Sequence, residues 1–273
     1  MNRLRLIIIV AALGTVRLMA NPAYPIGERF TFSAHFLGFI PIGTVWMEIS
    51  TGAFNNVPTV QINGRCLGDF KLYVADVRVT SHLSMLTDQS LYHYIEQYGS
   101  ERRGRRLLFD WNNNILQYVR LERDGNYKLR RTVPITPDVY DVFGAAFYAR
   151  RFFDPTLGAT SEIKVIETEK VFHLRCTPVE RRAFKVDGIG TFDAVRVKFE
   201  AINLQPHEIF KGFLNLDRDI VVWIETSTRT PLYMSSKVPF GIFRPTVEVV
   251  MKEWTTVPGF EPRLYGTNIV YHH

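Results

Sequence analysis

The feature that most constrains this fold is an alternation of apolar and polar residues that returns in short segments along the chain. In residues 29–36 the apolar side chains share one face of an extended strand, namely Phe30, Phe32, Ala34 and Phe36. A period of two residues is typical of a β-strand that buries one face. After a turn rich in Gly and Pro, the alternation resumes at Val45, Met47 and Ile49. The sequence therefore predicts a β-hairpin with an apolar connecting loop.

Further segments of this kind follow, separated by turn signals such as Asn112–Asn114 and Asp124-Gly125. The segments are 57–68, 70–80, 91–99, 105–111, 115–123, 127–133, 162–169, 171–180, 181–202, 219–228 and 231–254. Short strands in succession predict an antiparallel meander. No repeat or linker divides the sequence. We therefore expect residues 21–273 to form a single all-β, mainly antiparallel domain on a large curved sheet, with a division into two lobes as the alternative.

The pattern changes once, within residues 137–152. Apolar residues there follow the helical spacing i, i+3, i+4, i+7 and i+8, namely Val139, Val142, Phe143, Ala146 and Phe147. Thr136 can cap the first turn, and Pro137 suits the first helical position. Arg150 and Arg151 suit the negative end of the helix dipole. We predict one amphipathic helix that packs on the sheet and covers its core.

Residues 1–20 have the layout of a secretory signal peptide. Arg3 and Arg5 precede an apolar run, and Ala20 offers a small residue before a cleavage point. The apolar run is shorter than the ~20 residues that span a bilayer. We therefore expect removal of this segment rather than a permanent membrane anchor, which is the alternative. We expect no transmembrane segment in residues 21–273.

The charge of the chain gives little support to a nucleic-acid partner. Lys and Arg number 33 and Asp and Glu 27, for a formal net charge of +6. Residues 1–20 hold three of the arginines and no acid, so the exported chain would carry only +3. A mild charge of this kind makes a poor electrostatic footprint for nucleic acid, and we expect no such partner. Hydrophobic residues make up 46% of the chain, which is enough for a sizeable core.

Three stretches carry a resemblance to a known family. They are the opening FTFSAHFLGFIPIGTVWMEI, the central DVYDVFGAAFYARRF and the closing VVWIETSTRTPLYMSSKVPFGIF. In order and spacing the chain resembles the exported bacterial proteins grouped as domain of unknown function 3108 (DUF3108). The resemblance implies export to the periplasm of a Gram-negative type of envelope and an all-β fold, shaped as a half-open β-barrel wrapped on a helix. It transfers no activity to any residue of this sequence.

No catalytic or metal-binding motif accompanies these patterns. The sequence has no G-x-S-x-G elbow and no phosphate-binding glycine loop, and its internal histidines lack metal-ligand spacing. We interpret His35, His93 and His173 as residues on the wet face of strands. Asp138 and Asp141 are interpreted as helix-start residues rather than a catalytic carboxylate pair. We therefore predict no catalytic residue, no metal ligand and no cofactor.

Two apolar turns are the strongest candidates for a contact surface. Hairpin connections are normally polar, yet these place four apolar residues near chain reversals, namely Phe39, Ile42, Phe240 and Ile242. Exposed apolar patches tend to mark interaction sites. The four residues are predicted to bind a lipid-like ligand, an envelope protein or a membrane. The alternative is that they pack as ordinary core.

Arginines and cysteines supply the remaining candidates. Arg102 and Arg105 lie in an arginine-rich stretch, and the planar guanidinium group suits phosphate and carboxylate. These two are candidate anion-binding residues, with a solvated, salt-bridged surface as the alternative. Cys66 and Cys176 could form a disulfide in an oxidising compartment, or could be two buried thiols.

Together these observations lead to a hypothesis of function. We expect an exported, non-enzymatic binding or envelope-assembly protein with an apolar groove for a lipid-like or lipoprotein ligand. The competing hypothesis is an enzyme that acts on an envelope polymer through carboxylates gathered from distant strands. Convergent carboxylates in a concave pocket would favour the second hypothesis.

Overall fold

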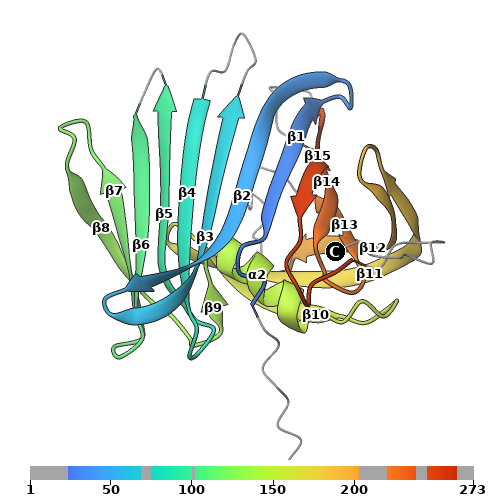
Figure 1. The fold of residues 1–273 in the computed structure, drawn as a ribbon. Helices are drawn as coiled ribbons and strands as arrows, with labels where there is room; N and C mark the ends of the chain where they lie inside the picture. Colours follow the sequence, from blue (N-terminus) through green and yellow to red (C-terminus); the bar gives the residue numbers. More distant parts are fainter. Residues whose placement is uncertain (1–23, 69–74, 100–101, 203–219, 238–244, 263–273) are drawn as a thin grey trace, which may run out of the picture.

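The computed structural model describes residues 24–68, 75–99, 102–202, 220–237 and 245–262 (Figure 1). Within them lie one α-helix, α2 (Val142–Phe152), and the strands of one large sheet. The strands are β1 (Arg29–Phe36), β2 (Ile40–Phe54), β3 (Val57–Gly68), β4 (Ala75–Ser84), β5 (Ser90–Gly99), β6 (Arg103–Asp110), β7 (Ile115–Leu121), β8 (Tyr127–Pro134), β9 (Val139–Tyr140), β10 (Ser161–Glu167), β11 (Lys170–Val186), β12 (Gly190–Ala201), β13 (Ile220–Glu225), β14 (Pro231–Lys237) and β15 (Thr246–Thr255).

The sheet is a long antiparallel meander, as the sequence predicts. Its strand order is β8-β7-β6-β5-β4-β3-β2-β1-β15-β14-β13-β12-β11-β10-β9. Neighbouring strands are antiparallel except β9 and β10, which run parallel. The pairing of β1 with β15 joins the two series of strands at the middle of the sheet. The all-β fold with one packed helix is thereby confirmed.

A short link between the two edge strands shows that the sheet is strongly curved. β8 and β9 lie at opposite ends of the strand order, yet only residues 135–138 separate Pro134 from Val139. A fully extended chain of that length spans at most about 18 Å. In the described sheet these edges are not paired with each other, and side chains connect the two ends, as in the 2.9 Å ion pair between Arg131 and Glu169. The sheet curls round without closing into a barrel.

The predicted opening hairpin is confirmed, with a shorter turn than expected. Along β1, Phe30, Phe32 and Ala34 are buried, while Arg29 on the other face is exposed. β2 begins at Ile40, because Ile40 pairs with Phe36 at the end of β1. The turn is therefore reduced to residues 37–39.

The helix begins later than predicted. The expected span was 137–152, whereas α2 starts at Val142. The cause is a distant strand. Val139 and Tyr140 pair with β10, so their backbone groups take part in the sheet rather than in the helix. Asp141 has extended backbone angles and accepts hydrogen bonds from the N–H groups of Phe143 and Gly144, so it caps the helix.

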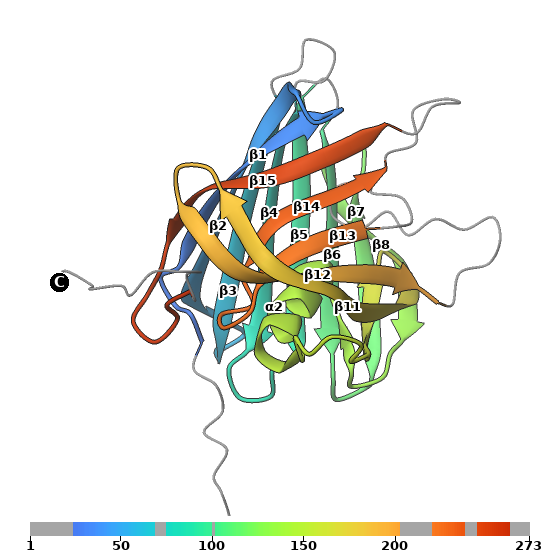
Figure 2. The same ribbon diagram turned by 90° about the vertical axis from the view of Figure 1, so that its right-hand side faces the viewer.

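α2 lies inside the curve of the sheet (Figure 2). Its residues belong to two of the three apolar clusters of the protein. The first cluster joins the β1–β4 region to the β12–β15 region, and Phe143 and Phe147 of α2 belong to it. The second cluster lies between α2 and β10–β13, and it includes Ala145. The third cluster packs β6 and β7 against β9 and β10, where the ends of the sheet meet. The helix is thus the central packing element of the fold.

No helix among the described residues has the length and apolar content needed to cross a membrane. The predicted signal peptide, residues 1–20, lies outside the described residues.

Candidate functional site

An apolar cavity of about 280 Å³ lies between α2 and the concave face of the sheet. One side of its wall comes from β1–β3 and the other from β10–β15. The lining is almost wholly hydrocarbon, with Phe30, Phe32 and Met47 on the first side and Val222 and Met234 on the second. Two charged residues, Arg150 and Arg229, complete the lining of the cavity.

α2 presents both small and aromatic residues to the cavity. Ala145, Ala146 and Ala149 line it, and so do Phe143 and Phe147, which also belong to the first cluster. An alanine side chain ends at Cβ, so the three alanines leave space between the helix and the opposite wall. Ala146 is exposed although its neighbours Ala145 and Phe147 are buried. The cavity therefore adjoins an exposed position of the helix.

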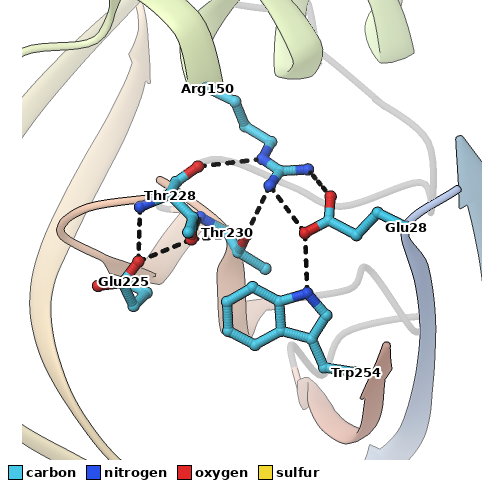
Figure 3. Close-up of polar contacts among 6 residues, drawn as sticks. All are labelled: Glu28, Arg150, Glu225, Thr228, Thr230 and Trp254. Atoms are coloured by element: carbon cyan, nitrogen blue, oxygen red, sulfur yellow. Dashed lines mark hydrogen bonds and ion pairs between the residues drawn. The ribbon is translucent and has the colours of Figure 1, made fainter. Parts of the chain in front are cut away.

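Arg150, at the C-terminal end of α2, is part of a buried network of hydrogen bonds (Figure 3). Its Nη1 donates to Oε2 of Glu28 at 2.5 Å, and its Nη2 donates to Oε1 of Glu28 at 3.2 Å and to Oγ1 of Thr230 at 2.6 Å. Nε1 of Trp254 donates to the same Glu28 carboxylate at 2.8 Å. The side chains of Arg150 and Glu28 are only 10% and 0% exposed. This guanidinium group is therefore structural, because it ties α2 to the start of β1 and to β15.

The network continues into the turn between β13 and β14. Oε2 of Glu225 accepts hydrogen bonds from the backbone N–H and the hydroxyl of Thr228, both at 2.6 Å. The hydroxyl oxygens of Thr228 and Thr230 lie 2.9 Å apart. The buried Glu225 carboxylate thus holds the turn in one conformation beside the cavity (Figure 3).

Arg229 sits within that turn and has a different environment from Arg150. Its φ of +57° places it in the left-handed region, which is uncommon for a residue other than glycine. Among the described residues, its one hydrogen bond is donated by Nε to the backbone oxygen of Phe153, at 2.7 Å. Phe153 is the C-cap of α2 and also lines the cavity. Arg229 is half-buried, and its Nη1 and Nη2 make no hydrogen bond with described residues.

The N-terminal end of α2 is anchored by a second buried carboxylate. Oδ1 of Asp141 accepts a hydrogen bond from Ser81 at 2.8 Å and lies 3.2 Å from Nδ1 of His93, while its Oδ2 accepts from Ser90 at 2.7 Å. Burial alone would raise the pKa of Asp141, but the neighbouring His93, the N–H of Gly144 and the Ser90 hydroxyl outweigh it and lower the pKa. The carboxylate therefore remains charged and fixes the helix to β4 and β5.

This Ser, His and Asp cluster is not arranged for nucleophilic catalysis. In a catalytic relay the histidine receives the serine proton on one ring nitrogen and contacts the carboxylate through the other. Here Ser81 and Asp141 both approach the same nitrogen, Nδ1 of His93, and all three side chains are buried. The prediction that His93 lies on a wet face is wrong, because it points from β5 toward α2 and contacts Phe143.

Arg151 makes a third attachment of the helix. It forms an ion pair with Asp88, which also accepts a hydrogen bond from the Tyr24 hydroxyl. Its guanidinium lies 4.3 Å from the centroid of the Tyr24 ring, a cation–π contact. Burial, followed by the Asp88 hydrogen bond, raises the pKa of Tyr24 to about 12. Arg150 and Arg151 are thus interior ion-pair residues, beyond the dipole role that the sequence suggests.

Of the apolar turn residues named from the sequence, the two that the structure describes, Phe39 and Ile42, do not line the cavity. Phe39 is 73% exposed at the tip of the β1–β2 turn, beside the exposed Leu37. Ile42 is half-buried and packs against the first cluster. Neither is among the residues that line the cavity. Phe240 and Ile242 lie outside the described residues.

The two candidate anion-binding arginines have separate partners. Nε of Arg102 donates to the buried Glu96 at 2.5 Å, and the Arg102 guanidinium lies 5.6 Å from the Tyr98 ring centroid. Arg105 approaches Glu167 at 3.9 Å, where the ends of the sheet meet. The structure does not bring these arginines together, and neither lines the cavity.

Both cysteines are free thiols in the structure rather than partners in a disulfide. Cys66 packs against the first cluster, whereas Cys176 belongs to the second and lines the cavity. Burial raises the pKa of both thiols, that of Cys176 to about 12. Low-pKa thiolate chemistry therefore has no support at either position.

Over the described ranges, no group of His, Cys, Asp and Glu side chains is arranged to hold a metal ion. The sequence analysis missed the residues that matter most for the cavity, namely Ala145, Ala149 and Arg229. One local signal was available, because small residues on a helix face between aromatic ones indicate space beside the helix. Arg229 has no such local signal, since its hydrogen-bond partner Phe153 is 76 positions away in the chain.

Comparison with known families agrees with the motifs in the sequence. The model of the family described as "Protein of unknown function (DUF3108)" matches residues 31–248, which is most of the chain. The chain belongs to this family. No curated protein and no solved structure matched the chain. The match includes α2 and most of the residues that line the cavity of this DUF3108 protein.

Proposed function

We propose that this protein is a non-enzymatic periplasmic binding protein that holds a lipid-like molecule in the cavity beneath α2. The observation that carries the proposal is the cavity itself, about 280 Å³ of space with a hydrocarbon wall. Pockets for small molecules are typically apolar, with a few polar groups that set orientation. Here the charged lining residue with hydrogen-bond donors that no described residue uses is Arg229.

The size of the cavity supports a hydrocarbon ligand. Small-molecule pockets are usually about 300–1,000 Å³, and the cavity, at about 280 Å³, is slightly smaller than that range. An apolar cavity of about 150 Å³ is already large enough to stay dry and bind benzene. A single alkyl chain is therefore a better match than a bulky lipid with several chains.

The position of the buried carboxylates favours binding over catalysis on a polymer. The enzyme hypothesis calls for carboxylates that converge on a concave pocket. Glu28 and Asp141 instead hold the two ends of α2, each surrounded by several hydrogen-bond donors. The hydrogen bonds that these two carboxylates accept therefore hold the helix that covers the cavity.

The test is mass spectrometry of organic extracts from the protein, purified gently from the periplasm of its own host. We expect a reproducible, near-stoichiometric lipid in the wild-type extract. The variant Ala146→Phe places a ring into the cavity from an exposed helix position, so it should lose that lipid. Ala53→Phe is the matched control, since it makes the same change at an exposed position of β2 outside the cavity.

Either of two results would overturn the proposal. One is a clean extract from the wild-type protein, with no lipid above that of an unrelated periplasmic control. The other is a lipid that remains at the same occupancy in Ala146→Phe, provided that circular dichroism shows the variant to be folded. A clean extract would redirect the search toward a protein partner of the exposed turn at Phe39.

Export is part of the proposal and is tested separately. The support is the charged start and apolar run of residues 1–20. Cell fractionation followed by intact mass measurement should find, in the periplasm, a chain that lacks about these residues. A full-length chain confined to the cytoplasm would refute it.

A further inference from the structure

We propose that the ligand of the cavity is a single-chain amphiphile with an oxyanion head, and that Arg229 binds this head while the chain occupies the cavity. The inference rests on the proposed function and names the chemical class of its ligand. Its basis is the difference between the two charged residues of an otherwise apolar lining, Arg150 and Arg229.

Arg150 has no capacity left for a ligand. Both of its Nη atoms donate to Glu28, Nη2 also donates to Thr230, and Nε points to the backbone oxygen of Thr228 at 3.4 Å. Its side chain is only 10% exposed. A ligand anion would have to displace the Glu28 carboxylate, which is itself fully buried.

Arg229 has the opposite arrangement. The bond from Nε to Phe153 fixes one edge of the guanidinium plane, and the described residues offer no hydrogen-bond acceptor to Nη1 or Nη2. The turn that carries it is held by Glu225, Thr228 and Thr230, so the side chain leaves from a fixed point. A guanidinium group presented in this way suits a carboxylate or phosphate oxygen pair.

The charge of Arg229 affects Asp154, but Asp154 does not neutralise it. Asp154 is fully exposed, and its pKa is lowered first by hydrogen bonds from Thr156 and only last by Arg229. Water screens a charge at such a position strongly. The positive charge of Arg229, a residue of the cavity lining, therefore remains available to a ligand.

Isothermal titration calorimetry on lipid-stripped exported protein tests the inference. The probes are decanoate, decan-1-ol and acetate, which separate the anionic head from the alkyl chain. The wild type should bind decanoate at least tenfold more tightly than decan-1-ol, and acetate should not bind measurably. Arg229→Gln should remove this preference while leaving decan-1-ol binding unchanged. Arg229→Lys should retain part of it, and Arg123→Gln, at an exposed arginine of another turn, should retain all of it.

The outcomes distinguish the inference from the function on which it rests. Equal binding of decanoate and decan-1-ol in the wild type, or a preference that survives in Arg229→Gln, overturns the oxyanion inference and leaves the cavity as a neutral lipid site. Acetate binding as tight as that of decanoate would also overturn it, because the site would then recognise a free anion without the chain. Failure of both ten-carbon probes to bind would overturn the proposed function together with the inference.

Discussion

The ion pair between Glu28 and Arg150 should be among the most costly contacts to break in this protein. Glu28→Gln keeps the shape of the side chain but removes the charge that faces the Arg150 guanidinium and receives the Trp254 N–H. Loss of one partner of a buried pair leaves an uncompensated charge and typically costs about 3–5 kcal/mol of unfolding free energy. For a domain of this size that corresponds to a fall in melting temperature of roughly 6–20 °C.

A matched substitution separates burial from simple loss of charge. Glu48 pairs with Arg29 at 3.0 Å, but their side chains are 43% and 67% exposed. Glu48→Gln should therefore cost only about 0–1 kcal/mol. Urea unfolding followed by circular dichroism at neutral pH gives both values, and an unchanged m-value would show that the folded state stays compact. The double variant Glu28→Gln, Arg150→Met should cost less than its two single changes together, because no unpaired charge remains.

The reasoning would be refuted by a Glu28→Gln variant within 1 kcal/mol of Glu48→Gln. Such a result would mean that water reaches Glu28 and Arg150 in solution. The C-terminal end of α2 would then be held by apolar packing alone.

Three further predictions concern other parts of the molecule. Because the pKa of Asp141 is lowered in the folded state, its charge stabilises the protein above the unfolded pKa of about 3.9. The difference in unfolding free energy between the wild type and Asp141→Asn should therefore shrink as the pH falls below about 4. A difference that stays constant down to pH 2 would contradict this. Burial raises the pKa of Cys66 and Cys176, so iodoacetamide at pH 8 should label neither thiol in the folded protein and both in urea; an intact mass two hydrogens short would instead reveal a disulfide. In a series of carboxylates of increasing chain length, each added methylene should tighten binding about fourfold until the cavity is full, while an affinity independent of length would exclude the cavity as the chain site.

Local patterns predicted the strands well because their alternation is decided within each segment. The expected segment 57–68 coincides with β3, and the apolar face of β1 is the buried one. The start of the helix was misplaced because β10, more than 20 residues later in the chain, captures residues 139–140 into the sheet. Propensity and capping rules depend only on residues that are close in sequence, whereas a tertiary contact determines where this helix starts.

The candidate site was less predictable, since it depends on contacts between distant parts of the chain. Glu28 and Trp254 are 226 positions apart, and Arg150 and Thr230 are 80 apart. The apolar turns were predicted as a contact surface because apolar residues near a chain reversal can be read directly from the sequence. A cavity is an absence of side-chain volume, and alanines on a helix predict it only when the opposite wall is known.

The anchored ends of α2 keep the helix away from the opposite wall of the cavity. Apolar side chains beside unfilled space lose van der Waals contacts, so a helix without anchors would gain contacts by moving inward to fill the 280 Å³. Asp141 at one end and Arg150 with Arg151 at the other prevent this movement. A ligand chain that occupies the cavity restores the missing contacts, and at 100 times its Kd it would stabilise the folded state by about 2.7 kcal/mol. Buried carboxylates thus hold both ends of α2, and this anchoring suits the proposed hydrocarbon site because it keeps the helix in place while the cavity is empty.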